Sequence, residues 1–317
     1  MNIQNVVIAG GGVLGSQIAF HAAYKGFSVT IWLRSEASIG RSRPKLEHLR
    51  STYLDTLEAL KPLCGSSSQQ YPHGLVDSLK DLTEEKIEKL KQKATEAYDS
   101  LVLTTDLKAA LKDADLVIES VAEDPQAKAS FYTQAAPLMP ERTILATNSS
   151  TMLPSSFAQY TGRPEKYLAI HFANEIWKNN TAEIMRHDGT STEAYDAAVG
   201  FAREIGMVPL CLKKEQPGYI LNSLLIPLLN AAQALYVNGV ADPETIDLTW
   251  RMGTGAPAGP FQILDIVGLN TAYNIVMMSP DAKDPDSTAG KIAAVLKEHI
   301  DAGRTGVNAG EGFYKYN

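Results

Sequence analysis

Short apolar runs alternate with longer amphipathic stretches over the first two thirds of the chain. Short runs rich in β-branched residues are typical of buried strands, and apolar residues at every third or fourth position are typical of helices. The pattern predicts strands over residues 6–10, 28–32, 100–104, 115–120, 143–147, 167–172, 182–185 and 207–212. It predicts helices over about 16–24, 38–60, 84–97, 126–136 and 192–205. This alternation favours an α/β fold with a doubly wound parallel sheet.

The pattern changes near Lys213, where the β-branched runs end. Helical patterns separated by Pro and Gly continue from there to the last residues. We therefore expect a sheet domain over residues 1–212 and an all-helical C-terminal domain over residues 213–317. The chain length of 317 residues suits two domains of ordinary size.

An uncharged stretch, residues 218–240, is long enough to span a bilayer. Several of its residues are polar and would have to lie in hydrocarbon, namely Asn222, Ser223, Asn230 and Gln233. Such side chains are costly in a membrane, whereas a soluble helix buried on most sides can pair them. We expect a soluble helix here and no membrane partner.

The charge balance argues against nucleic acid as a partner. Lys and Arg number 29 and Asp and Glu number 36, which gives a net charge of −7. The two cysteines, Cys64 and Cys211, lie far apart with no histidine cluster near them, so we expect no metal site and a reducing compartment. The first residues have no basic region and no small-residue cleavage site, which favours the cytoplasm.

The first chemical motif is GGGVLG, residues 10–15, directly after the first predicted strand. In a Rossmann-type fold Gly10 would make the tight turn, Gly12 would admit a pyrophosphate to the backbone, and Gly15 would let the helix pack on the strand. Val13 and Leu14 lie between these glycines and belong to the same expected site. The N-terminus of the following helix would offer amide donors to the phosphates.

The end of the second predicted strand bears on which dinucleotide binds. An acidic residue there would hold the ribose 2′-hydroxyl of NAD, but Leu33 occupies the position and is followed by Arg34 and Ser35. A guanidinium and a hydroxyl suit a 2′-phosphate instead. We therefore expect NADP, with NAD as the alternative.

Several motifs together resemble the 3-hydroxyacyl-CoA dehydrogenase family, and in particular its short members similar to 3-hydroxybutyryl-CoA dehydrogenases. They follow the family's order along nearly the whole chain. The segments are DLVIESVAED (115–124), ATNSSTM (146–152), RPEKYLAIHFAN (163–174), AEIM (182–185), PGYILNSLL (217–225), GAPAGPFQILDIVGLN (255–270) and GEGFYKY (310–316).

The resemblance implies a set of catalytic residues. His171 would move the proton of the hydroxyl group, and Glu183 would orient its ring and stabilise the imidazolium. Ser150 and Asn222 would donate hydrogen bonds to the substrate oxygen. Histidine suits proton transfer near neutral pH, but a histidine inside an apolar strand is by itself more often a core residue, so the catalytic role of His171 depends on the resemblance.

The resemblance also implies residues near the nicotinamide and its ribose. These are Glu123, Lys128, Asn174 and again Ser150. A surface ion pair would explain Glu123 and Lys128 equally well.

The chain is an atypical member in this comparison. Leu33 stands where most members have an acidic residue, and residues 172–182, FANEIWKNNTA, lack the usual Asn-Pro-x-Pro segment. Ser223 and Asn308 stand where basic residues are usual. These differences concern the cofactor ribose and the acyl-CoA contacts, and they leave the expected catalytic residues intact.

The leading hypothesis is an NADP-preferring oxidoreductase that interconverts short 3-oxoacyl-CoA and 3-hydroxyacyl-CoA. The alternative keeps the chemistry but replaces the substrate with a small non-CoA hydroxy acid, as in sugar-acid or carnitine dehydrogenases. A third hypothesis is a catalytically idle dinucleotide-binding protein, which the intact catalytic set disfavours. We also expect the helical domain to complete the substrate site and to form a homodimer, because its uncharged helix offers more apolar surface than a small domain needs.

Overall fold

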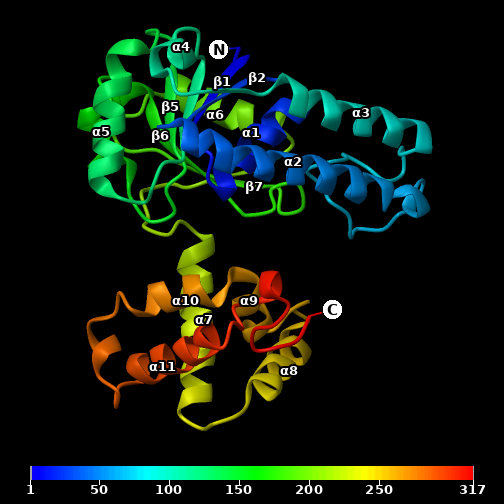
Figure 1. Cartoon of the computed structure of the whole chain (residues 1–317), viewed down its shortest axis with the longest axis vertical. Helices are drawn as coiled ribbons and strands as arrows, with labels where there is room; N and C mark the ends of the chain where they lie inside the picture. The colour runs from blue at the N-terminus through cyan, green and yellow to red at the C-terminus, as the bar shows by residue number, and fades with distance from the viewer. Residues whose placement is uncertain (1, 317) are drawn as a thin grey trace. The chain divides into compact units, whose positions relative to one another are not determined.

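A single eight-stranded sheet organises the larger part of the computed structural model, which describes residues 2–316 (Figure 1). The strand order is β3-β2-β1-β4-β5-β6-β7-β8, and all neighbours are parallel except β6 and β7. The strands are β1 (Asn5–Ala9), β2 (Ser28–Trp32), β3 (Val102–Thr104), β4 (Leu116–Glu119), β5 (Ile144–Thr147), β6 (Tyr167–Phe172), β7 (Thr181–Met185) and β8 (Val208–Cys211). The predicted Rossmann-type α/β fold is confirmed.

Helices cover both faces of this sheet, and the alternation of side chains along the strands supplies a core to each. Val6 and Ile8 of β1 pack in one core, and Val7 and Ala9 pack in the other. The first core also holds buried residues of α1 (Val13–Tyr24), α2 (Glu36–Glu58), α3 (Glu84–Ser100) and α6 (Thr192–Glu204). The second core holds residues of α4 (Leu107–Leu111) and α5 (Pro125–Ala135).

The turn between β1 and α1 depends on glycine at two positions. Gly10 has a φ of 120°, and a Cβ there would overlap the carbonyl oxygen of Ser120 at the end of β4. A Cβ on Gly15 would overlap the carbonyl oxygen of Gly10, so α1 packs directly on the turn. A Cβ on Gly12 would meet no heavy atom within 4 Å, and this position is therefore open to a ligand.

The remaining helices form a separate unit with its own core, centred on Phe261, Leu264 and Leu296. They are α7 (Leu221–Val237), α8 (Pro243–Thr254), α9 (Pro260–Val267), α10 (Leu269–Val276) and α11 (Thr288–Asp301). The buried carboxylate of Asp265 ties the C-terminal segment to this core by accepting from the backbone N–H groups of Phe313 (2.8 Å) and Tyr314 (2.9 Å). The all-helical character expected for the C-terminal part is confirmed.

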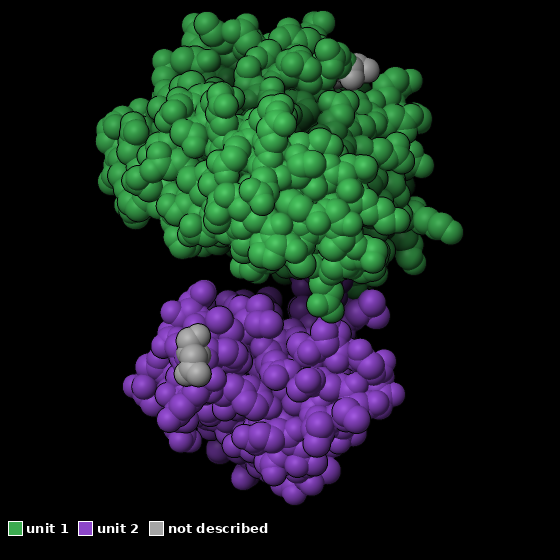
Figure 2. Space-filling model, turned by 90° about the vertical axis from the view of Figure 1, so that its right-hand side faces the viewer, with its two compact units in different colours: residues 1–220 green, residues 221–317 purple. Residues whose placement is uncertain are grey.

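The chain divides into units of residues 1–220 and 221–317, which are coloured separately in Figure 2. Residues 213–220, which the sequence pattern groups with the helices, thus belong to the sheet unit. The physical reason is Tyr219, whose ring is buried against His171 of β6. Among the described residues, no helix combines the length and the apolar character that crossing a membrane requires.

Candidate active site

The pairing of β6 with β7 brings His171 and Glu183 together. The two strands are antiparallel, and these two residues are direct partners in the register. Directly opposed residues point to the same face of a sheet, so their side chains meet. Nδ1 of His171 lies 3.0 Å from Oε2 of Glu183, and both side chains are buried.

The second oxygen of Glu183 is also engaged. Oε1 of Glu183 accepts a hydrogen bond of 2.8 Å from the backbone N–H of Ile220. A carboxylate can only accept hydrogen bonds, so Nδ1 of a neutral His171 ring must carry the hydrogen. Nε2 is then the acceptor. This is the tautomer that a general base needs if it is to take a proton from a hydroxyl group.

Ser150 occupies the other side of the imidazole. It lies in the loop after β5, and its Oγ is 3.2 Å from Nε2 of His171. The structure therefore places three of the four predicted catalytic residues in one hydrogen-bonded series, Ser150, His171 and Glu183. Asn222 lies in α7 of the second unit, and its catalytic role stays a prediction.

Tyr219 covers the imidazole ring and was not singled out from the sequence. Its ring stacks on that of His171, with centroids 4.5 Å apart and an interplanar angle of 16°. Burial, followed by the charges of Glu123 and Glu183, raises the pKa of the Tyr219 hydroxyl, which stays protonated and donates to the carbonyl oxygen of Ser149 at 2.8 Å. Tyr219 has a φ of 55°, a conformation that is strained for a residue with a Cβ, and its buried contacts hold it there.

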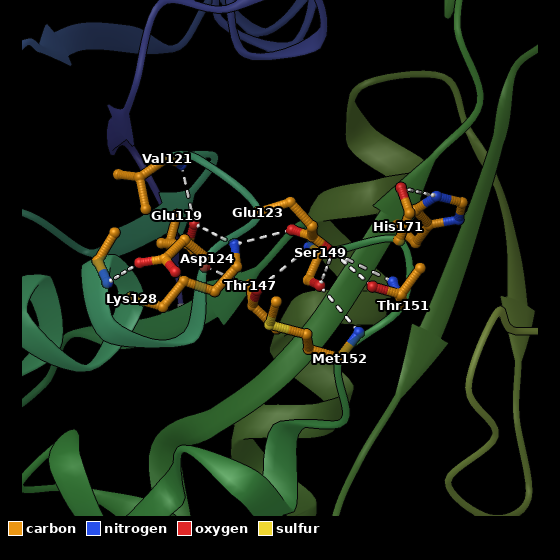
Figure 3. Close-up of polar contacts among 12 residues, drawn as sticks. Glu119, Val121, Glu123, Asp124, Lys128, Thr147, Ser149, Thr151, Met152 and His171 are labelled. Atoms are coloured by element: carbon orange, nitrogen blue, oxygen red, sulfur yellow. Dashed lines mark hydrogen bonds and ion pairs between the residues drawn. The ribbon is translucent and has the colours of Figure 1, made fainter. Parts of the chain in front are cut away.

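Glu123 and Lys128 form part of a polar network that reaches the loop containing Ser150 (Figure 3). Nζ of Lys128 lies 2.7 Å from Oε1 of the buried Glu119 and 3.2 Å from Oε2 of Glu123. Burial acts to raise the pKa of Glu123, but the hydrogen bond from Ser149 and the charge of Lys128 outweigh it and lower the pKa. Glu119, like Tyr219, was not among the site residues expected from the sequence.

A cleft of about 660 Å³ lies over the glycine turn and the end of β2. Gly10 and Gly12 line it together with Leu33 and Arg34. The first turn of α1 has no acidic residue and no side-chain cap at Gly12, so its amide groups can receive a phosphate. These residues fit a dinucleotide: the glycine turn leaves room for the pyrophosphate, and the cleft extends to where the adenosine ribose would lie.

Two further basic residues of α2 line the same cleft, Arg41 and Lys45. Nζ of Lys45 donates to the carbonyl oxygen of Gly11 at 3.1 Å, and Arg41 donates to Oγ of Ser38 at 2.9 Å. Ser35 caps α2 by accepting from the backbone N–H of Ser38 at 3.3 Å.

The other predicted cofactor residues lie around the start of α1 and after β6. Val13 is exposed in the first turn of α1, and Leu14 packs against the core. Asn174 is exposed in the loop after β6, where its carbonyl oxygen accepts from Nδ2 of Asn179 at 2.8 Å. Their contacts with a cofactor stay predictions.

Family models match most of the chain. The model described as "3-hydroxyacyl-CoA dehydrogenase, NAD binding domain" matches residues 64–216, and the one described as "3-hydroxyacyl-CoA dehydrogenase, C-terminal domain" matches residues 218–316. The chain belongs to the 3-hydroxyacyl-CoA dehydrogenase family. The resemblance inferred from the motifs is thereby confirmed. The glycine turn precedes the matched range, so its assignment rests on the geometry given above.

Individual relatives extend this comparison. A probable 3-hydroxybutyryl-CoA dehydrogenase of Deinococcus radiodurans is 32% identical over 247 residues, which cover 76% of this chain and 87% of that protein. The mitochondrial hydroxyacyl-coenzyme A dehydrogenase of Homo sapiens is 29% identical and covers 99% of this chain and 91% of its own. A solved diketoreductase structure, described as catalysing reactions of dicarbonyl compounds, is 46% identical with a TM-score of 0.84 and full coverage of both chains. This 3-hydroxyacyl-CoA dehydrogenase family member is therefore an oxidoreductase with a nicotinamide cofactor.

Replacing His171 by Gln should lower kcat by several orders of magnitude and change the Kd of the reduced cofactor little. The variant removes the proton carrier but leaves the glycine turn intact. Glu183→Gln should come close to this loss, because an amide cannot stabilise the imidazolium as a carboxylate does. Steady-state kinetics and fluorescence titration of the reduced cofactor measure the two effects. Wild-type kcat in either variant would show that the pair does not carry the proton.

Proposed function

We propose that this family member interconverts short 3-oxoacyl-CoA and (S)-3-hydroxyacyl-CoA. The observation that carries the proposal is the series Ser150, His171 and Glu183, joined by hydrogen bonds of 3.2 and 3.0 Å. A carbonyl reduction needs a proton donor and a donor that stabilises negative charge on oxygen, and this series supplies both.

The residues divide the work as follows. When bound, the nicotinamide supplies or accepts a hydride at its C4. In the reductive direction, Nε2 of protonated His171 gives a proton to the carbonyl oxygen as the alkoxide develops, and Oγ of Ser150 donates a hydrogen bond to the same oxygen. Glu183 stabilises the imidazolium through Nδ1. In the oxidative direction, neutral Nε2 takes the hydroxyl proton.

A second candidate substrate is a small dicarbonyl compound without CoA. The 46% identity to a diketoreductase favours it. The segment after His171 favours it as well. The resemblance leads us to expect an Asn-Pro-x-Pro segment here, beside the acyl thioester of the substrate. In this chain Ile176 and Trp177 instead fold into the core, and the carbonyl oxygen of Trp177 accepts from the N–H of Gly74 at 3.1 Å.

Initial rates with acetoacetyl-CoA, free acetoacetate and a small diketone without CoA, each with NADPH and with NADH, test both candidates. For the first candidate we expect kcat/KM with acetoacetyl-CoA to exceed the other two by at least about tenfold, since CoA contacts add binding energy. A preference for the diketone would support the second candidate and overturn the first. No turnover with any of the three would contradict both and support an idle dinucleotide-binding protein.

We also propose that NADP is preferred to NAD. Leu33 is buried where a carboxylate would hold a free ribose hydroxyl, and Arg34, Arg41 and Lys45 line the cleft next to it. Three cations and no carboxylate among the residues that line this cleft favour a 2′-phosphate. NAD is the alternative, and the matched family model is one for NAD binding.

Arg34→Gln should lower kcat/KM for NADPH by roughly ten- to a hundredfold and leave that for NADH nearly unchanged, since a charge-assisted pair contributes about 1.5 to 3 kcal/mol. Adding Leu33→Asp should reverse the preference. Arg43→Gln is the matched control, because it removes the same charge from an exposed position of α2. Equal efficiency with the two cofactors in the unmodified protein would show that Arg34 does not meet a phosphate.

A homodimer formed by the helical unit is a further part of the proposal. Its support is the apolar side chains that this unit exposes, among them Leu224, Met252 and Met278. Light scattering should give twice the mass of one chain at micromolar concentration. The mass of a single chain with full activity would contradict the dimer.

The cytoplasmic location expected from the sequence stays a prediction.

A further inference from the structure

Glu119, the last residue of β4, is a fully buried carboxylate that accepts four hydrogen bonds. Oε1 accepts from Nζ of Lys128 (2.7 Å) and the N–H of Val121 (2.8 Å). Oε2 accepts from the hydroxyls of Tyr132 (2.6 Å) and Thr147 (2.8 Å). A buried carboxylate with this many donors holds a fixed position, because moving it would lengthen hydrogen bonds that a low-dielectric interior cannot replace with water.

Thr147 forms the shorter connection from Glu119 to the loop that contains Ser150. Its Oγ1 donates to Glu119 and accepts from the backbone N–H of Ser149 at 3.1 Å. A hydroxyl carries one hydrogen, and the carboxylate can only accept, so Glu119 determines the direction in which Thr147 presents its lone pairs. The hydrogen bond from the N–H of Ser149 to Thr147 therefore holds the start of this loop in place.

Lys128 and Glu123 form the longer connection. Nζ of Lys128 lies between Glu119 and Glu123 (Figure 3). Oε1 of Glu123 accepts from Oγ of Ser149, and from Oγ1 (3.0 Å) and the N–H (3.3 Å) of Thr151. This connection therefore holds the residues on both sides of Ser150.

We propose that Glu119 and Thr147 are positioning residues that direct Oγ of Ser150 toward Nε2 of His171. Both connections end on the neighbours of Ser150, and Ser150 itself makes the 3.2 Å contact with the imidazole. The two residues act through Ser150, and their hydrogen bonds given above contact neither Ser150 nor His171. The inference rests on the proposed function, because it assigns Ser150 to the developing negative charge. A displacement of about 1 Å in such a donor can lower the rate by up to roughly a hundredfold.

Thr147→Val tests the shorter connection with almost no change in shape. We expect kcat to fall roughly five- to twentyfold, with KM for the carbonyl substrate within about twofold, because the loop loses a hydrogen bond that orients Ser150. Thr147→Ser keeps the hydroxyl and should restore most of kcat. Thr143→Val is the matched control, because Thr143 lies directly before the same strand and its buried Oγ1 donates to the carbonyl oxygen of Ala114 (2.6 Å), outside the network. It should lower Tm by less than Thr147→Val does, because its partner is a neutral carbonyl rather than a carboxylate, and it should leave kcat unchanged.

A double-mutant cycle with Ser150→Ala separates positioning from a general loss of structure. If Thr147 acts through Ser150, Thr147→Val should lower kcat by less than about twofold in the Ser150→Ala background. Glu119→Gln should be non-additive with Ser150→Ala in the same way. Losses that multiply in the double variants, or a Thr147→Val variant with wild-type kcat, would overturn the inference.

The same cycle distinguishes failure of this inference from failure of the proposed function. If Ser150→Ala alone leaves kcat unchanged, Ser150 has no catalytic role, and the inference fails together with the role that the proposed function gives to Ser150, although the turnover itself still supports the proposed reaction. If Ser150→Ala is slow and Thr147→Val is as fast as Thr143→Val, the proposed function stands and only the positioning role is wrong.

Discussion

The antiparallel register between β6 and β7 is the constraint on which the site depends. Every other neighbouring pair in the sheet is parallel, and a parallel neighbour would require a long crossover before it could face β6. The reversal places Glu183 opposite His171 after only a short connection. A slip of one residue would turn the carboxylate to the opposite face and leave the buried imidazole without its acceptor.

The parallel part of the sheet supplies the other components at one end. The glycine turn follows β1, Glu119 ends β4, and the loop of Ser150 follows β5. Parallel strands bring their carboxyl ends to the same edge, where open α/β sheets bind their ligands. The strand order therefore places both the cleft over the glycine turn and the series of Ser150, His171 and Glu183, although their residues are distant in sequence.

Buried charged and polar groups form a hydrogen-bonded network at this edge of the sheet. Glu119 and Lys128 form a buried ion pair. Thr147 and Glu123 connect this pair to the loop that contains Ser150 through hydrogen bonds. Tyr219 contacts the same loop, because its ring stacks on His171 and its hydroxyl donates to the carbonyl oxygen of Ser149. Burying such groups costs free energy, and in our proposal this cost is offset because Oγ of Ser150 is held toward His171.

Local patterning in the sequence determined much of this architecture, because hydrophobic period and glycine placement act over a few residues. The eight strands, the glycine turn at Gly10 and the helical C-terminal part all follow from that information. Family motifs pointed to His171, Glu183 and Ser150, which in isolation resemble core or surface residues. Only the tertiary structure showed that Tyr219 belongs to the sheet unit and that Glu119 and Thr147 support the loop of Ser150. Those roles depend on which side chains meet when strands far apart in sequence become neighbours, and the hydrophobic pattern, which reports only that such residues are buried, does not contain that information.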